Sequence, residues 1–157
     1  MLTVLLQRIT YYCAIGFGSG RLPKAPGTFG TLVGVLLYLP LSTLSLPVYL
    51  AITGLVFLTG IGICGYAARH LGKHDHPSIV WDEIAGFFVC MIAAPQGILW
   101  VVLGFCLFRL FDILKPWPIS WLDRHINGGL GIMLDDVAAG IAANLCLQGI
   151  AYSVQAI

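Results

Sequence analysis

Two pairs of adjacent carboxylates, Asp82-Glu83 and Asp135-Asp136, stand at the edges of long apolar runs. Carboxylates at or within a bilayer are costly unless they are paired, bind a metal or face water, so they are functional candidates. We expect each pair to open a helix at the same membrane face. Four acids held close together in a low-dielectric place need a cation, and sites rich in oxygen ligands suit Mg²⁺. The alternative is that the helix dipole alone favours acids in a first turn.

Charged residues also recur along the segment FRLFDILKPWP, where Arg109, Asp112 and Lys115 are spaced three apart. This spacing places them on one face of a predicted helix. The two cations are candidates for binding an anion. Asp112 is a candidate general base or a further metal ligand, and Asp75 is a second candidate base. The same stripe could instead be a plain ladder of ion pairs along the helix.

Residues 16–31, GFGSGRLPKAPGTFGT, are dense in glycine and proline. A Gly-rich turn beside a helix start leaves backbone N–H groups free to face an anion, and the segment adds Arg21, Lys24 and Thr28 as phosphate-binding candidates. The nucleotide-binding pattern G-x-x-x-x-G-K-[ST] is absent. The alternative is a flexible loop whose glycines serve packing.

The composition is that of a membrane protein. Of the 157 residues, 59% are hydrophobic and 10% are charged, whereas an average soluble domain has roughly 25% charged residues. The formal net charge of +1 argues against nucleic acid as a partner, because phosphate-backbone binding needs a basic stripe. The five cysteines lack the paired spacing of a zinc site. No linker or repeat divides the chain, so we expect one domain over residues 1–157.

Five apolar runs approach the roughly 20 residues that a membrane-spanning helix needs. The first four form two hairpins joined by short turns, and residues 1–10 favour an amphipathic helix near the membrane interface. We therefore expect an all-α, multi-pass membrane helical bundle with about five crossings and an N-terminal interfacial helix. The predicted runs are Phe29–Leu46, Val48–Ala68, Ser78–Ala94, Gly97–Leu114 and Val137–Ile157.

All fifteen charged residues, eight basic and seven acidic, and all four histidines fall in residues 8–24, 69–83 and 109–136. Each hairpin returns the chain to the side from which it started, so these three polar segments share one membrane face. They can therefore meet in one site. Because Lys and Arg gather there, the positive-inside rule places that face in the cytoplasm.

Four motifs in this order carry a family resemblance: residues 16–31, D-H-P-S-I-V-W-D-E-I-A-G at 75–86, F-R-L-F-D-I-L-K-P-W-P at 108–118, and G-G-L-G-I-M-L-D-D-V-A-A-G at 128–140. The chain resembles the phosphatidylglycerophosphatase A family, which removes the terminal phosphate of phosphatidylglycerophosphate to give phosphatidylglycerol. The resemblance implies an all-helical, Mg²⁺-dependent phosphatase of the bacterial cytoplasmic (inner) membrane that acts in glycerophospholipid synthesis.

With this resemblance, we expect metal-assisted hydrolysis. Asp82, Glu83, Asp135 and Asp136 would hold one or two Mg²⁺ ions. The cations Arg21, Lys24, Arg109 and Lys115 would neutralise the phosphate. The sequence has neither the cysteine-nucleophile phosphatase loop nor the D-x-D of aspartyl-phosphate phosphatases.

Three other functions fit part of the pattern. Acids within a membrane also mark ion pathways, so a small cation carrier is one alternative. A non-catalytic assembly subunit is the second, with the acids pairing with the basic residues. A phosphatidyl-group transferase is the third, but its expected D-G…A-R…G…D…D run is missing.

Overall fold

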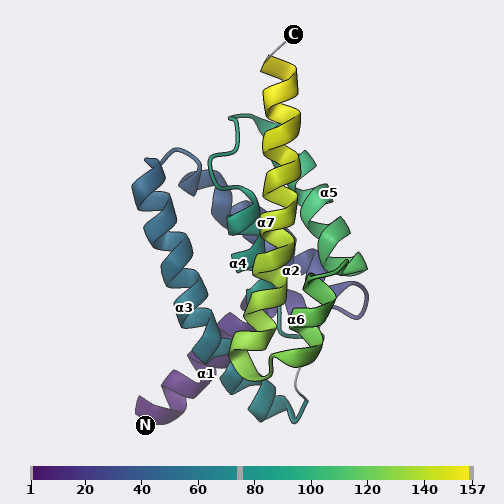
Figure 1. Cartoon of the computed structure of the whole chain (residues 1–157). Coiled ribbons are helices and arrows are strands. Elements are labelled where there is room, and N and C mark those ends of the chain that lie inside the picture. The colour runs from purple at the N-terminus through teal and green to yellow at the C-terminus, as the bar shows by residue number, and fades with distance from the viewer. Residues whose placement is uncertain (1, 74–75, 156–157) are drawn as a thin grey trace.

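The computed structural model describes residues 2–73 and 76–155, and every regular element in these two ranges is a helix (Figure 1). The predicted all-α class is therefore confirmed. In chain order the elements are α1 (Leu2–Ala14), the 3₁₀ segment η1 (Gly16–Arg21), α2 (Pro26–Leu41), α3 (Leu46–Leu71), α4 (Trp81–Cys90), α5 (Ile98–Leu114), α6 (Ile119–His125) and α7 (Gly128–Gln155).

Helix α4 forms the centre of the bundle and packs against α7, α2 and α3. Seven of its ten residues are buried. Its backbone approaches that of α7 so closely that a Cβ on Gly140 would overlap the carbonyl of Gly86. Beside this contact, the fully buried rings of Phe87 and Phe108 pack edge to face. Burial of each ring contributes about 1.5–3 kcal/mol to stability.

The predicted run Ser78–Ala94 is longer than the helix that forms there, because α4 ends at Cys90. The chain then turns beside α7, and the carbonyls left free at the end of α4 need donors. Asn144 of α7 donates to the carbonyls of Cys90 and Ile92, each at 2.8 Å. Gln148, one turn further along α7, donates to the carbonyls of Ile92 and Ala93. Two amide side chains of α7 thus allow α4 to stop early.

Helix α7 begins at Gly128, nine residues before the predicted start at Val137. The expectation that Asp135 and Asp136 open this helix is therefore wrong, since they lie about two turns inside it. The first turn is rich in glycine because it crosses α3 at close range. A Cβ on Gly129 would overlap the carbonyl of Ile61.

Two helices in the described part of the chain, α3 and α7, are long and apolar enough to cross a membrane. Only 17% of the most apolar stretch of α3 is buried, so most of its apolar surface faces away from the bundle. Leu55 and Leu58 on α3 and Leu99 on α5 are more than 60% exposed. Helices α2, α4 and α5, with 16, 10 and 17 residues, are shorter than a full span. Five crossings remain a prediction.

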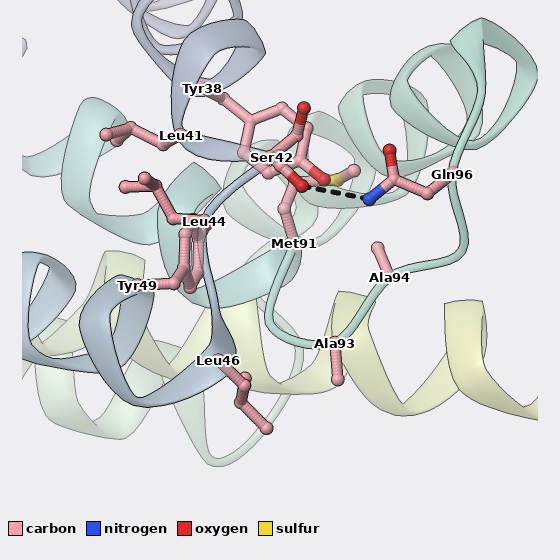
Figure 2. Close-up of a pocket in the computed structure, with 10 residues that line it drawn as sticks. All are labelled: Tyr38, Leu41, Ser42, Leu44, Leu46, Tyr49, Met91, Ala93, Ala94 and Gln96. Carbon is pink, nitrogen blue, oxygen red and sulfur yellow. Dashed lines mark hydrogen bonds between the residues drawn. The ribbon is translucent and has the colours of Figure 1, made fainter.

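The two hairpin turns meet at the end of the bundle where the C-terminus lies (Figure 1). Figure 2 shows a small hollow of about 110 Å³ between them, where the Gln96 amide donates to the carbonyl of Ser42 at 2.9 Å. The Tyr49 hydroxyl nearby donates to the carbonyl of Phe88. None of the described residues that line this hollow is charged.

The predicted N-terminal helix is present as α1, which packs beside α3 and η1. Leu5, Leu6 and Ile9 are each more than half exposed on its outer side. Its end is fixed by the N–H of Val80, which donates to the carbonyl of Ala14 at 2.9 Å. The interfacial position of this helix stays a prediction.

Candidate active site

Three carboxylates from two helices form a cluster at the N-terminal end of α4. Asp82 and Glu83 lie in the first turn of α4 and Asp136 comes from α7, and each offers an oxygen within 4.8 Å of the others. Asp82 and Asp136 are 6% and 4% exposed. Asp112 of α5 and Asp135 of α7 are close enough to act electrostatically on Asp136. The site thus concentrates negative charge away from water.

The donor set of this cluster fits a hard divalent cation. Oε2 of Glu83 and Oδ2 of Asp136 are buried and have no hydrogen-bond partner among the described residues. Carboxylates this close repel one another, and their burial weakens the solvation that would otherwise stabilise each charge. Carboxylate oxygens are the ligands that Mg²⁺ takes together with water and phosphate. A cation among the three would offset both costs.

Arg109 of α5 lies against the cluster. Its Nη1 forms an ion pair with Asp112 and lies 3.9 Å from Oε1 of Glu83. It also donates to Oγ1 of Thr31 at 3.3 Å, and the Thr31 hydroxyl in turn donates to the carbonyl of Gly27 at 2.8 Å. Groups from α2, α4 and α5 thus hold the guanidinium in place. Its Nε–H has no acceptor among the described residues.

Lys115, directly after α5, joins three helices. Its Nζ lies 2.6 Å from Oδ2 of Asp135 on α7 and 2.9 Å from Oδ1 of Asp123 on α6. Partial burial lowers the pKa of Lys115, but the hydrogen bonds to Asp123 and Asp135 outweigh it and raise the pKa above its usual value. The ammonium group is therefore charged at neutral pH.

A cavity of about 300 Å³ connects these groups. Its walls come from the second and third polar segments, 69–83 and 109–136, and from residues 25–27, which directly follow the first segment. The expected convergence is therefore confirmed for two of the three segments, while none of the described residues in 8–24 lines the cavity. The lining residues are Ala25, Pro26, Gly27, Pro77, Ile79, Asp82, Glu83, Arg109, Asp112, Ile113, Lys115, Asp135 and Asp136.

The Gly-rich segment positions α4 through Val80, which is completely buried one residue before the helix starts. A Cβ on Gly16 or Gly30 would run into the Val80 side chain, and one on Gly20 would overlap the carbonyl of Ser78. Gly16 also has a positive φ of 52°. Packing therefore accounts for these glycines, as the alternative interpretation held.

The three phosphate-binding candidates of that segment are not among the described residues that line the cavity. Arg21 is exposed, with its guanidinium 5.5 Å from the centre of the Tyr11 ring. Lys24 is exposed, and Thr28 is half-buried with its N–H bonded to the carbonyl of Ala25. Asp75, the second candidate base, lies outside the described residues.

Sequence reasoning missed two residues of this arrangement, Thr31 and Asp123. Thr31 is completely buried and receives Arg109. Its position three residues after Thr28, in the same motif, was the available signal. Asp123 is the remaining acid of the third polar segment, and it bonds to Lys115.

Comparison with known proteins gives consistent matches. The family model described as phosphatidylglycerophosphatase A matches residues 12–151. The chain is 45% identical to phosphatidylglycerophosphatase A of Haemophilus influenzae over 141 residues, 88% of this chain and 86% of that protein. It is 43% identical to phosphatidylglycerophosphatase A of Escherichia coli K12 over 129 residues, 82% and 75% of the two chains.

A third relative, from Bacteroides thetaiotaomicron, is named "Putative phosphatidylinositol-3-phosphatase". It is 37% identical over 136 residues, 80% of this chain and 83% of that protein. No solved structure matches the chain. The family match spans most of the sequence and includes every described residue of the cavity. The chain therefore belongs to the phosphatidylglycerophosphatase A family and is a phosphatase.

Proposed function

We propose that this enzyme hydrolyses phosphatidylglycerophosphate to phosphatidylglycerol and inorganic phosphate, with Mg²⁺, at the cytoplasmic face of a bacterial inner membrane. The observation that carries the proposal is the cavity lined by the cluster of Asp82, Glu83 and Asp136 together with Arg109 and Lys115. Anionic ligands for a cation, beside cations for an anion, suit a phosphate monoester and its metal. We take the headgroup of the substrate from the names of the two relatives, both of which are phosphatidylglycerophosphatase A.

Asp82, Glu83 and Asp136 would hold the metal. A bound Mg²⁺ would supply positive charge to the phosphate oxygens and lower the pKa of a bound water. Asp135 was expected as a fourth ligand, but its Oδ2 lies 2.6 Å from Nζ of Lys115. We therefore assign Asp135 to holding Lys115 at the edge of the cavity, where the ammonium group can attract the substrate's phosphate.

Arg109 would bind the phosphate, because its guanidinium lies beside the carboxylate cluster and is held from three helices. Bidentate hydrogen bonds from arginine suit a phosphate group. In the free enzyme the Arg109 charge is shared with Asp112. The Nε–H of Arg109 has no acceptor among the described residues and would be open to a phosphate oxygen.

Asp112 would then accept a proton from the attacking water. The water oxygen forms a bond to phosphorus as the bond from phosphorus to the glycerol oxygen breaks, and that oxygen takes up a proton to give the alcohol of phosphatidylglycerol. Inorganic phosphate leaves the cavity. Arg109 lies where it can offset the negative charge that develops on the phosphate oxygens.

The bundle would keep this cavity at the level of the lipid headgroups. Exposed apolar side chains on α3 and α5 would face acyl chains, and about five crossings would hold the charged end of the bundle at one membrane surface. The acyl chains of the substrate would then stay in the bilayer while its terminal phosphate enters the cavity.

The test is release of inorganic phosphate by the purified chain in detergent, given phosphatidylglycerophosphate with Mg²⁺ or with a chelator. We expect release with Mg²⁺ and none with the chelator. Phosphatidylinositol 3-phosphate forms a second arm, because one relative carries that substrate in its name. Faster release from it would replace the proposed substrate. No metal-dependent release from either lipid would refute the proposal.

A further inference from the structure

Two hollows lie on neighbouring faces of α1, and Arg8 lines both of them. One measures about 290 Å³ and lies between α1 and α3; the other measures about 300 Å³ and lies between α1 and the start of η1. Residues three and four apart share a helix face, so two sets of α1 side chains at this spacing line the two hollows. The first is lined by Val4, Gln7, Arg8, Tyr11, Tyr66 and His70, the second by Arg8, Ile9, Tyr12, Cys13 and Phe17.

The first hollow is basic and aromatic. The His70 ring stacks on Tyr66, with 5.9 Å between ring centres, and meets Tyr11 edge to face at 5.4 Å. Arg21 lies over the Tyr11 ring and adds a further positive charge nearby. None of the described residues that line this hollow is acidic. Hydroxyl, amide, imidazole and guanidinium donors therefore surround a space with a positive potential, which favours an anion.

The second hollow is apolar apart from Arg8. The side chains of Ile9, Tyr12 and Phe17 line it, and each is more than half exposed. Exposed apolar side chains gathered at one place are typical of contact with a membrane or a ligand. A hydrocarbon chain would cover them, whereas a water-soluble ligand would leave them in water.

We propose that these two hollows bind one anionic glycerophospholipid. Its phosphodiester would lie against Arg8 and His70, and one acyl chain would lie against Ile9, Tyr12 and Phe17. An anion-binding hollow directly beside an apolar one matches the shape and charge of such an amphiphile, and Arg8 lies at the boundary where headgroup and chain would join. A soluble anion would use only the first hollow and a neutral lipid only the second.

This lipid site is separate from the catalytic cavity, because the two share no lining residue among those described. It does not depend on the proposed substrate. An anionic lipid held here would fix α1 at the membrane interface, and the end of α1 is bonded to the start of α4, because the N–H of Val80 donates to the carbonyl of Ala14. The site would therefore couple the anionic lipid content of the membrane to the order of this end of the bundle.

Native mass spectrometry of the full chain in neutral detergent tests the site. The Arg109→Gln variant serves as background, so that the catalytic cavity contributes less anion binding. We expect this background to retain one phosphatidylglycerol and no phosphatidylcholine of the same acyl chains. Adding Arg8→Gln should weaken retention about fivefold, and His70→Gln should weaken it further, because each removes a headgroup contact.

Three controls make the result specific. Arg8→Lys keeps the charge and should retain the lipid, Arg124→Gln removes an exposed cation elsewhere and should change nothing, and Ile9→Asn should weaken retention through the acyl chain. Equal retention of phosphatidylcholine, or unchanged retention in Arg8→Gln, would overturn the site. Glycerol 1-phosphate competing as well as the lipid would also overturn it, because the apolar hollow would then have no part.

Discussion

Gly27, in the first turn of α2, lies directly against the Glu83 carboxylate of α4. A Cβ at position 27 would overlap Oε1 of Glu83 and would lie 3.1 Å from each Nη atom of Arg109. Both partners are themselves constrained, since Glu83 belongs to the carboxylate cluster and Arg109 pairs with Asp112. The α2 backbone thus forms a wall of the candidate catalytic cavity, and only glycine fits it without displacing a charged group.

We predict that Gly27→Ala lowers kcat about 10²-fold, because it moves the Glu83 and Arg109 side chains and misplacement by about 1 Å can cost that much. The melting temperature should change little, since alanine is favoured over glycine in a helix. The matched control is Gly54→Ala in α3, where an added Cβ meets nothing within 4 Å. Phosphate release and melting temperature measure both effects. A Gly27→Ala enzyme as active as Gly54→Ala would show that this contact does not matter.

The cluster itself predicts opposite effects on stability and activity. Neutralising one of three crowded acids relieves repulsion, so Glu83→Gln and Asp136→Asn should raise the melting temperature in the presence of a chelator. Both should lose more than about 10²-fold in activity. Loss of an outer-shell partner already costs up to about 10²-fold, and a direct metal ligand should cost more.

Thermal unfolding with and without Mg²⁺ gives a second measurement of the same cluster. A ligand at 100 times its Kd stabilises a protein by about 2.7 kcal/mol, so Mg²⁺ should raise the melting temperature of the wild type. The rise should be absent from Glu83→Gln and Asp136→Asn and intact in Asp123→Asn, which lies outside the cluster. An equal rise in all four proteins would contradict the assignment of the metal ligands.

Lys115 provides a prediction about pH. Removing its charge in Lys115→Met leaves Asp135, 5% exposed, without this cation and should cost about 1–3 kcal/mol of stability. The folded-state pKa of Lys115 is raised, so its contribution is fully present below the unfolded value of about 10.4 and is lost only as pH rises through the folded value.

The difference in melting temperature between the wild type and Lys115→Met should therefore stay constant from about pH 7 to 9 and shrink above about pH 10.4. Asp123→Asn removes the more exposed partner, so it should cost only about 0–1 kcal/mol. A difference that stays constant or grows above about pH 10.4 would show that the two carboxylates do not raise this pKa.

The sequence predicted the meeting of the second and third polar segments better than the role of each acid. Hairpin geometry alone brought Glu83 and Arg109 to one place, because charges occur at only one end of each apolar pair. It could not separate Asp135 from Asp136. Consecutive helical residues point about 100° apart, so one faces the cluster and the other faces Lys115. The rotation of α7 decides which, and packing against α3 and α4 sets that rotation.

The ends of α4 and α7 also could not be predicted from the sequence. The run Ser78–Ala94 has the composition of a span, yet α4 stops at Cys90 because Asn144 and Gln148, more than 50 residues later, satisfy the freed carbonyls. The hydrophobicity of a segment does not indicate that hydrogen-bond donors far along the chain will end its helix. In the same way, the start of α7 depends on the fit of Gly129 against Ile61 of α3.

Membrane topology supplies the last prediction. If α2 to α5 cross as two hairpins, Thr43 and Asn127 lie on opposite membrane surfaces, because Thr43 follows α2 at the uncharged end and Asn127 precedes α7 at the charged end. Both residues are exposed. In a variant whose native cysteines are replaced by alanine, an impermeant maleimide added to intact bacterial spheroplasts should label Thr43→Cys at once. Asn127→Cys should react only after permeabilisation, since the positive-inside rule places the charged end in the cytoplasm.

Labelling of both from the outside would mean that α2 and α5, at 16 and 17 residues, do not span the bilayer. The reverse pattern would keep the crossings and move the catalytic cavity to the outer surface.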